Sequence, residues 1–174
     1  MTLALALTTL CQAQSRKVIT LPSWDFSRDG KAWQQVAVPH DWAISGPFDK
    51  KWDLQMVAIE QNGEKEKTEK SGRSGALPWI GEGMYKMNWT APKGYKRAVL
   101  VFDGAMSQPV VSVNGKEAGK WAYGYNAFRI DITPFIQFGK SNLIEVHLNN
   151  VEESSRWYPG GGLYRPVSVE LYGN

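Results

Sequence analysis

Apolar and polar residues alternate along most of the chain in short runs, and each run ends at turn-forming residues. In Asn142–Asn149, for example, every second residue is apolar, namely Ile144, Val146 and Leu148. A period of two predicts a strand with one buried face. Similar runs cover residues 33–38, 84–89, 98–102, 109–113, 128–132 and 167–171. This spacing predicts an all-β fold, an antiparallel β-sandwich of about eight strands.

Turn signals separate these runs. Asn114-Gly115 follows the run at residues 109–113 and is a strong hairpin signal. Thr133–Ile136 has a proline at its second residue and predicts one helix-like turn. Residues 43–80 break the rhythm, so we expect one long excursion between strands, mobile around residues 60–75.

Composition supports this fold and suggests a ligand class. The 174 residues suffice for one domain, and 8 Trp, 7 Tyr and 6 Phe accompany 17 Gly and 9 Pro. Exposed aromatic rings suit the flat faces of sugars, although core packing also uses such rings. The net charge of +3 is scattered, with no basic stripe, which argues against nucleic-acid binding.

The N-terminus resembles a targeting segment. Residues 1–14 read as the remnant of a secretory signal, with cleavage after Ala13 or Gln14, and residues 15–174 then form a single sandwich domain. A short buried or disordered N-terminus is the alternative. Cleavage would remove Cys11, so no disulfide is expected, and the protein would be secreted or periplasmic. No later run approaches the length of a membrane span.

Two histidines are the first candidates for chemistry. His147 alternates with the apolar residues of its run, so we expect it on the outer, solvated face of a strand. His40 precedes Asp41, which invites a catalytic interpretation, but a hydrogen-bonded structural role where the strand ends is the alternative we favour. Two histidines without a ligating cysteine do not predict a metal site, and we expect no cofactor.

A glycosidic reaction would need two carboxylates about 5–5.5 Å apart for retention. Candidates are Glu82, Asp103, Asp131, Glu152 and Glu153, but no pair stands out, and turn capping explains Asp103 and Asp131. No nucleophile-elbow, phosphate-loop or zinc-protease motif is present. We therefore assign no catalytic residue. The chain is predicted to be a module that binds a ligand or positions other groups.

The C-terminal segment SRWYPGGGLYR, residues 155–165, places aromatic rings and two arginines around three glycines. Glycines allow positive φ and a close approach to a neighbour. Arg165 and Tyr164 either contact a ligand or pin the segment to its own sandwich. The candidate substrate-binding residues are Arg156, Trp157 and Tyr158.

Several short motifs follow one another in a familiar order. They are Val38–Trp42, Gly81–Lys86, Phe102–Met106, Val113–Lys116, Gly124-Tyr125, Asp131–Thr133 and Ser155–Gly160. Over residues 24–173 this series resembles the N-terminal sugar-binding domain of glycoside hydrolase family 2, most of all in bacterial β-galactosidases. The resemblance implies a jelly-roll, galactose-binding-domain-like sandwich. It also implies that an immunoglobulin-like domain and a barrel follow, the barrel carrying both catalytic glutamates.

The resemblance implies a non-catalytic role for this chain. It would pack on the barrel of a retaining glycoside hydrolase, lend loops to the rim of a β-galactoside pocket, and be inactive alone. The expected partners are a carbohydrate and the remaining domains. The alternatives are a free-standing, lectin-like carbohydrate-binding module that uses rings such as Trp121, Tyr123, Tyr125 or Trp157, and a sandwich without sugar contact.

The chain departs from the family pattern at three positions. Met84 stands where relatives often have an aromatic residue, and Lys86 replaces an arginine. Pro166 stands where an aspartate is common. A proline removes a backbone donor at the start of the last strand, which a sheet edge would tolerate.

Overall fold

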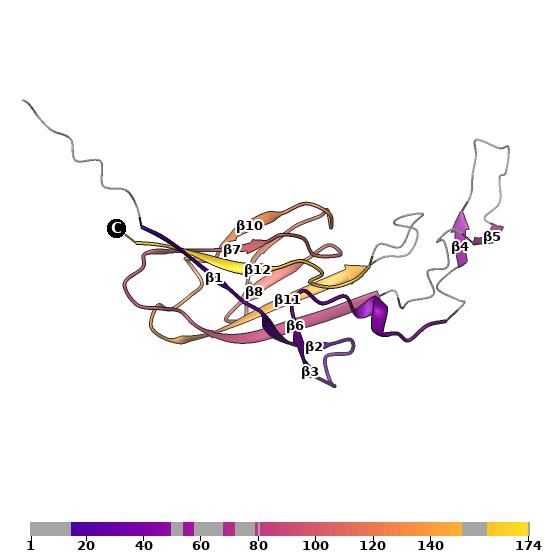
Figure 1. The fold of residues 1–174 in the computed structure, drawn as a ribbon, viewed down its shortest axis with the longest axis horizontal. Coiled ribbons are helices and arrows are strands. Elements are labelled where there is room, and N and C mark those ends of the chain that lie inside the picture. The colour runs from indigo at the N-terminus through magenta and orange to yellow at the C-terminus, as the bar shows by residue number, and fades with distance from the viewer. Residues whose placement is uncertain are drawn as a thin grey trace, which may run out of the picture.

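The structure, a computed structural model, describes residues 15–49, 54–57, 68–71, 79, 81–150 and 160–173, and all structural statements below concern these residues. They form two antiparallel sheets that pack face to face (Figure 1) and a separate two-stranded ribbon. The predicted all-β sandwich is therefore confirmed. The proposed signal, residues 1–14, lies outside the described part.

The smaller sheet has four strands in the order β1, β12, β7 and β10. Their bounds are Arg16–Thr20, Val167–Tyr172, Arg97–Phe102 and Phe128–Asp131. β12 is therefore a central strand, so Pro166 precedes a strand that is paired on both sides and not an edge strand. Pro166 is tolerated because the ladder begins only at Val167, while the Pro166 carbonyl accepts a hydrogen bond from Asp103 N at 3.1 Å.

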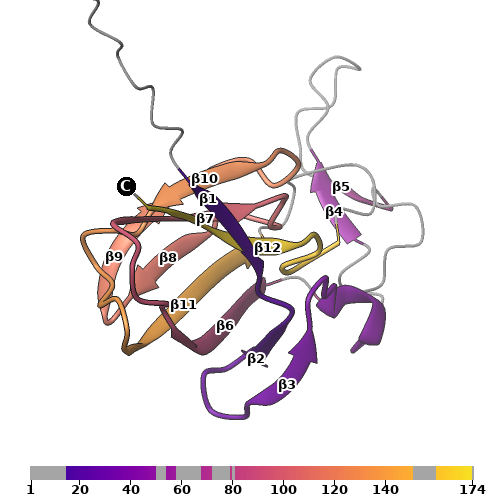
Figure 2. The same ribbon diagram turned by 60° about the vertical axis from the view of Figure 1, so that its left-hand side comes forward.

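The larger sheet has six strands in the order β3, β2, β6, β11, β8 and β9, which Figure 2 shows side by side. Their bounds are Gln34–Ala37, Ser23–Ser27, Gly81–Thr90, Ser141–Asn150, Val110–Val113 and Lys116–Lys120. β6 and β11 pair over ten residues, from Gly81 opposite Asn150 to Thr90 opposite Ser141. The predicted hairpin joins β8 to β9, where Asn114 and Gly115 both have positive φ.

The segment expected to be one excursion contains regular structure. Trp42–Ser45 forms a 3₁₀ turn, η1, and Leu54–Val57 (β4) pairs with Thr68–Ser71 (β5). Most of residues 60–75, predicted to be mobile, lie outside the described part. The predicted turn at Thr133–Ile136 is present, closed by hydrogen bonds to Ile132 O.

Most strands with a buried and a less buried face were predicted from the sequence, and the exposed strands were not. All seven predicted runs form strands, and in β11 the side chains of Ile144, Val146 and Leu148 are buried as expected. β1 and β9 were missed, and most of their residues are exposed, which leaves no apolar face to detect. β2 was missed as well, although Trp24 and Phe26 alternate with polar residues and are buried. The structure therefore has more strands than the eight predicted.

The core lies between the two sheets and uses much of the aromatic content. Trp24, Phe26, Trp42, Tyr85 and Phe102 are among its largest fully buried side chains. Within the described residues, no helix is long and apolar enough to cross a membrane.

Candidate functional site

Four loops meet at one end of the sandwich, beside η1 in Figure 1. We call this region the loop end and define it as residues 40–46, 104–109, 121–126 and 160–165. Met106 and Gly162 exchange two backbone hydrogen bonds of 2.9 Å, which join the second loop to the fourth. The described residues of the candidate segment, from Gly160 onward, therefore lie at the loop end.

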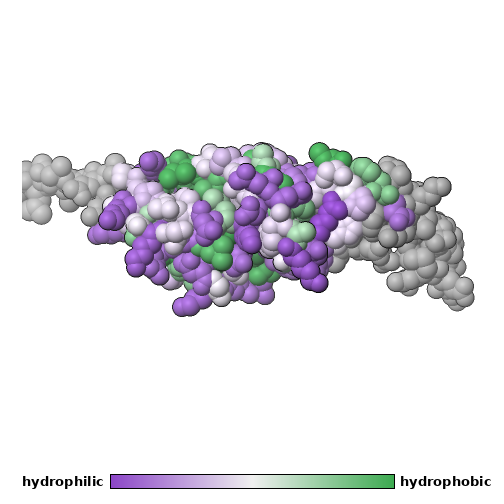
Figure 3. Space-filling model, turned by 90° about the horizontal axis from the view of Figure 1, so that it is seen from below, coloured by the Kyte–Doolittle hydropathy of each residue, from purple (hydrophilic) through white to green (hydrophobic). Residues whose placement is uncertain are grey.

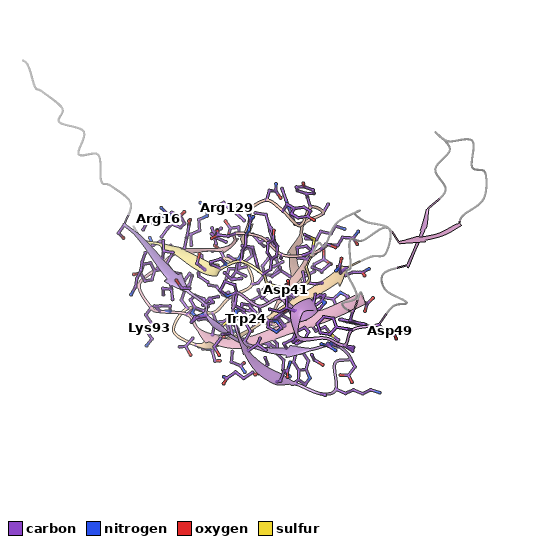
Figure 4. All side chains as sticks on the ribbon, turned by 45° about the vertical axis from the view of Figure 1, so that its right-hand side comes forward. Arg16, Trp24, Asp41, Asp49, Lys93 and Arg129 are labelled. Carbon is purple, nitrogen blue, oxygen red and sulfur yellow. The ribbon has the colours of Figure 1, made fainter. Side chains whose placement is uncertain are left out.

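Asp41 fastens this segment to η1, as its position in Figure 4 illustrates. Its Oδ1 accepts hydrogen bonds from Ala43 N and Gly161 N, both at 2.9 Å. The first bond is an N-cap of the 3₁₀ turn. Trp42 N and His40 N donate to Gly161 O and Leu163 O at 2.9 and 2.8 Å. Residues 161–163 are thus laid along residues 40–42 by backbone bonds.

The glycines make this contact possible. A Cβ added to Gly83 or to Gly161 would fall closer than 3.0 Å to the Trp42 indole, so the ring is held between two glycines. A Cβ on Gly162 would meet the Tyr85 hydroxyl and His40 O, and its φ of 114° also excludes most side chains. The close approach expected of the glycines is confirmed, and the neighbour they approach belongs to the same sandwich.

His40 has the structural role that we favoured. Its Nδ1 lies 2.7 Å from the Tyr85 hydroxyl, and its ring packs on Phe26 at 4.9 Å between centroids. Burial lowers the pKa of His40, an effect that nearby Asp41 opposes, and burial raises the pKa of Tyr85. Both groups are therefore neutral near pH 7 and bonded to each other, which suits positioning rather than proton transfer.

Tyr164 and Arg165 hold a second loop in place. The Tyr164 hydroxyl donates to Gly124 O at 2.8 Å, and Arg165 Nη1 donates to Tyr125 O and Asp103 O at 3.1 and 3.2 Å. For these two residues the pinning alternative is confirmed. They position the aromatic loop 121–126 against the C-terminal segment.

The predicted substrate-binding residues Arg156, Trp157 and Tyr158 lie outside the described residues, and their role stays a prediction. The structure does fix the two ends of their segment, since Asn150 Nδ2 donates to Gly160 O at 2.9 Å. Among the described residues, two buried polar atoms at this point, Trp42 Nε1 and Asn150 Oδ1, find no hydrogen-bonding partner. Buried polar groups are almost always paired, so these two atoms are exceptions within the described part of the chain.

Of the other candidates, His147 and Asp131 lie on the strands, and Glu152 and Glu153 lie outside the described residues. His147 is on the outer face of β11 as expected, with Nε2 3.2 Å from Glu82 Oε2. Asp131 caps a turn, as predicted, by accepting from Thr133 N at 3.0 Å, and it also pairs with Arg97. Among the described residues, no group of three acidic, histidine or cysteine side chains could hold a metal ion.

Sequence reasoning missed one cluster at the loop end. The Arg28 guanidinium lies 5.2 Å from the centre of the Trp79 ring and donates to Gly46 O. Trp79 in turn packs on Trp42 at 5.6 Å. No local pattern could have paired these residues, because they come from three separate segments.

Comparison with known proteins gives consistent relatives, although no family model matches the chain. The chain is 33% identical to β-galactosidase BoGH2A of Bacteroides ovatus over 144 residues, and 33% identical to a putative β-glucuronidase of Formosa agariphila over 151 residues. These matches cover 81% and 83% of the chain but only 15% and 13% of the relatives. A glycosyl hydrolase family 2 member from Bacteroides cellulosilyticus superimposes with a TM-score of 0.68 at 26% identity, covering 88% of this chain and 20% of that one.

Fold and relatives together define a β-sandwich module of the kind found in glycoside hydrolases. The chain belongs to glycoside hydrolase family 2, with the fold of the family's N-terminal domain. It spans about one seventh of the length of the curated relatives it matches.

Proposed function

We propose that this chain is the non-catalytic first domain of a secreted or periplasmic β-galactosidase-like enzyme. The domain packs on a catalytic barrel and presents residues 151–159 at the rim of the sugar pocket. The bond from Asn150 to Gly160 carries this proposal, because it brings the two ends of that segment together on a rigid frame. A loop that supplies substrate contacts needs such a frame.

The proposal assigns binding to Arg156, Trp157 and Tyr158. In the full-length enzyme, Trp157→Ala should lower kcat/KM for a nitrophenyl β-galactoside about tenfold while the melting temperature changes little. Tyr164→Phe is the matched control, since it loses a pinning bond and should lower stability first. A Trp157→Ala enzyme that melts earlier but keeps its turnover would return Trp157 to a structural role.

The substrate is the finer part of the proposal. One relative is named a β-galactosidase and another a putative β-glucuronidase, so the full-length enzyme should be assayed on both nitrophenyl glycosides. We expect the galactoside to be preferred, and the present chain alone to hydrolyse neither. Turnover by the chain that follows its peak through purification would contradict the non-catalytic role.

Export is tested separately. N-terminal sequencing of the mature protein from a periplasmic or culture fraction should begin after Ala13 or Gln14. A cytoplasmic protein that retains Met1 would contradict the proposed export.

A further inference from the structure

The outer face of the six-stranded sheet carries a row of residues in cross-strand register. Lys120 lies opposite Val110, Val110 opposite His147, and His147 opposite Met84. Met84 is in turn opposite Ser27 on β2. Five strands at their normal spacing make this row about 19 Å long. It crosses the sheet rather than following one strand.

Two hollows lie along this row and share Val110. One, of about 410 Å³, is lined by Gln108, Val110, Lys120, Trp121 and Ala122. The other, of about 360 Å³, includes Trp33, Met84, Val110, Ser112, Glu145 and His147 in its lining. Because they meet at one residue, we treat them as a single depression, the sheet groove, with a tryptophan at each end.

Trp121 is fixed in place at one end of the sheet groove. Its ring stacks on Phe128 at 5.7 Å and 7°, and Phe128 stacks on Phe102 at 4.7 Å and 6°. Its Nε1 donates to Asn126 Oδ1 at 2.8 Å, yet the residue is 40% exposed. A ring that is supported on one face and along its edge can receive a ligand on the other face without first becoming ordered.

Trp33 closes the other end differently. Its Nε1 donates to Gly30 O at 3.1 Å, and the Lys86 ammonium lies 3.8 Å from its ring centre. One face of Trp33 is therefore occupied by a cation. Trp33 acts as a wall of the groove, and Trp121 is the open ring.

A second row, of polar residues, runs parallel to the first and lies two residues away from it along each strand. Ser112 lies opposite Glu145, Glu145 opposite Lys86, and Lys86 opposite Asp25. At the Trp121 end, Gln108 and Lys120 line the groove, and no side-chain hydrogen bond of either is found among the described residues. Acidic and basic groups alternate along the groove, so it has no strong charge of either sign.

We propose that the sheet groove binds a chain of a neutral glycan, with one sugar ring on the open face of Trp121. The C–H face of a pyranose packs on an indole, while its hydroxyls pair with donors and acceptors such as Gln108, Ser112 and Glu145. A protein partner would favour a contiguous apolar patch. Figure 3, seen from the side of β2, β3 and β6, instead shows small hydrophobic patches between hydrophilic side chains.

Affinity electrophoresis of this chain in gels that contain β-1,4-galactan, with anionic β-1,4-glucuronan for comparison, tests the proposal. We expect galactan to retard the chain more than glucuronan does. Trp121→Ala should weaken galactan binding about tenfold, and Trp33→Ala less. Tyr123→Ala is the matched control, because Tyr123 is an exposed ring of the same loop that lines neither hollow. It should bind as the wild type does.

Any of three results would overturn the proposal. These are no retardation of the chain by galactan, equal retardation by galactan and glucuronan, and an equal loss of galactan binding in Tyr123→Ala and Trp121→Ala. Thermal melts of all variants separate lost binding from lost folding, and Glu145→Arg, which blocks the middle of the groove on the exposed face, should abolish retardation in a folded chain. In the full-length enzyme, Glu145→Arg, which lies outside the loop end, should leave nitrophenyl galactoside turnover unchanged. That result distinguishes failure of the groove from failure of the pocket-rim role.

Discussion

Two carboxylates, Glu170 and Asp41, organise two different regions by different means. Glu170 lies on the outer face of the four-stranded sheet, where Arg16, Arg129 and Tyr172 donate to it (Figure 4 labels both arginines). Its side chain is 3% exposed although both arginines are about half exposed. Asp41 instead receives backbone N–H groups from two loops. The region around Glu170 is held by charged hydrogen bonds, and the region around Asp41 depends on the close fit of its loops.

The largest expected effect tests that close fit. Gly161→Ala places a methyl group against the Trp42 indole and should lower the free energy of unfolding by about 3 kcal/mol. Gly94→Ala is the contrasting variant, since nothing lies within 4 Å of its added Cβ and only its positive φ, which Gly161 does not have, opposes the change; it should cost about 1 kcal/mol. Urea melts measure both variants, and a loss at Gly161 no larger than the loss at Gly94 would show that the contact with Trp42 is not tight.

The charged region should respond next. Glu170→Gln keeps the shape of the side chain but removes its charge, and should lower the free energy of unfolding by about 2 kcal/mol. Asp131→Asn, in the exposed pair with Arg97, should cost well under about 1 kcal/mol. If the two variants melt alike, Glu170 does not hold the sheet through its charge.

The stability of the two regions should depend differently on pH. Hydrogen bonds from Arg129, Tyr172 and Arg16 lower the pKa of Glu170 to about 2, from an ordinary value of 4.5. A lowered pKa means that the stabilisation is complete above pH 4.5 and is lost as pH falls toward 2. The difference in melting temperature between wild type and Glu170→Gln should therefore shrink over this range, while the Gly161→Ala penalty persists. A constant Glu170→Gln difference down to pH 2 would contradict the assignment.

The smallest effect concerns the buried pair at the loop end. Tyr85→Phe removes the hydroxyl that bonds His40 and should cost about 1 kcal/mol. Because burial lowers the pKa of His40, folding favours its neutral form, so stability should fall as pH drops below about 6.5. Melting curves of the wild type and of Tyr85→Phe at pH 5 and pH 7 check both expectations. A variant as stable as the wild type at both would mean that the bond contributes nothing.

The sequence predicted most of the strands in which apolar and polar residues alternate. In β11 the buried and exposed positions follow directly from alternation, and Asn114-Gly115 specified its hairpin. The loop end was less accessible, because Asp41 and Gly161 are 120 residues apart and no local pattern pairs them. The sheet groove depends on register: Val110, His147 and Met84 form a row only once β8, β11 and β6 are aligned.

The position of β12 has a consequence for how the protein is made. Among the strands described, a ribosome produces β1 first and β12 last, yet β12 lies between β1 and β7. While β12 is still inside the ribosome, β1 lacks its neighbour and two of the three ladders in that sheet cannot form. Pairing over so long a separation is slow and leaves strand edges open meanwhile. Expression as two fragments divided between β11 and β12 should therefore yield aggregates, whereas co-expression of the same fragments could restore the sheet.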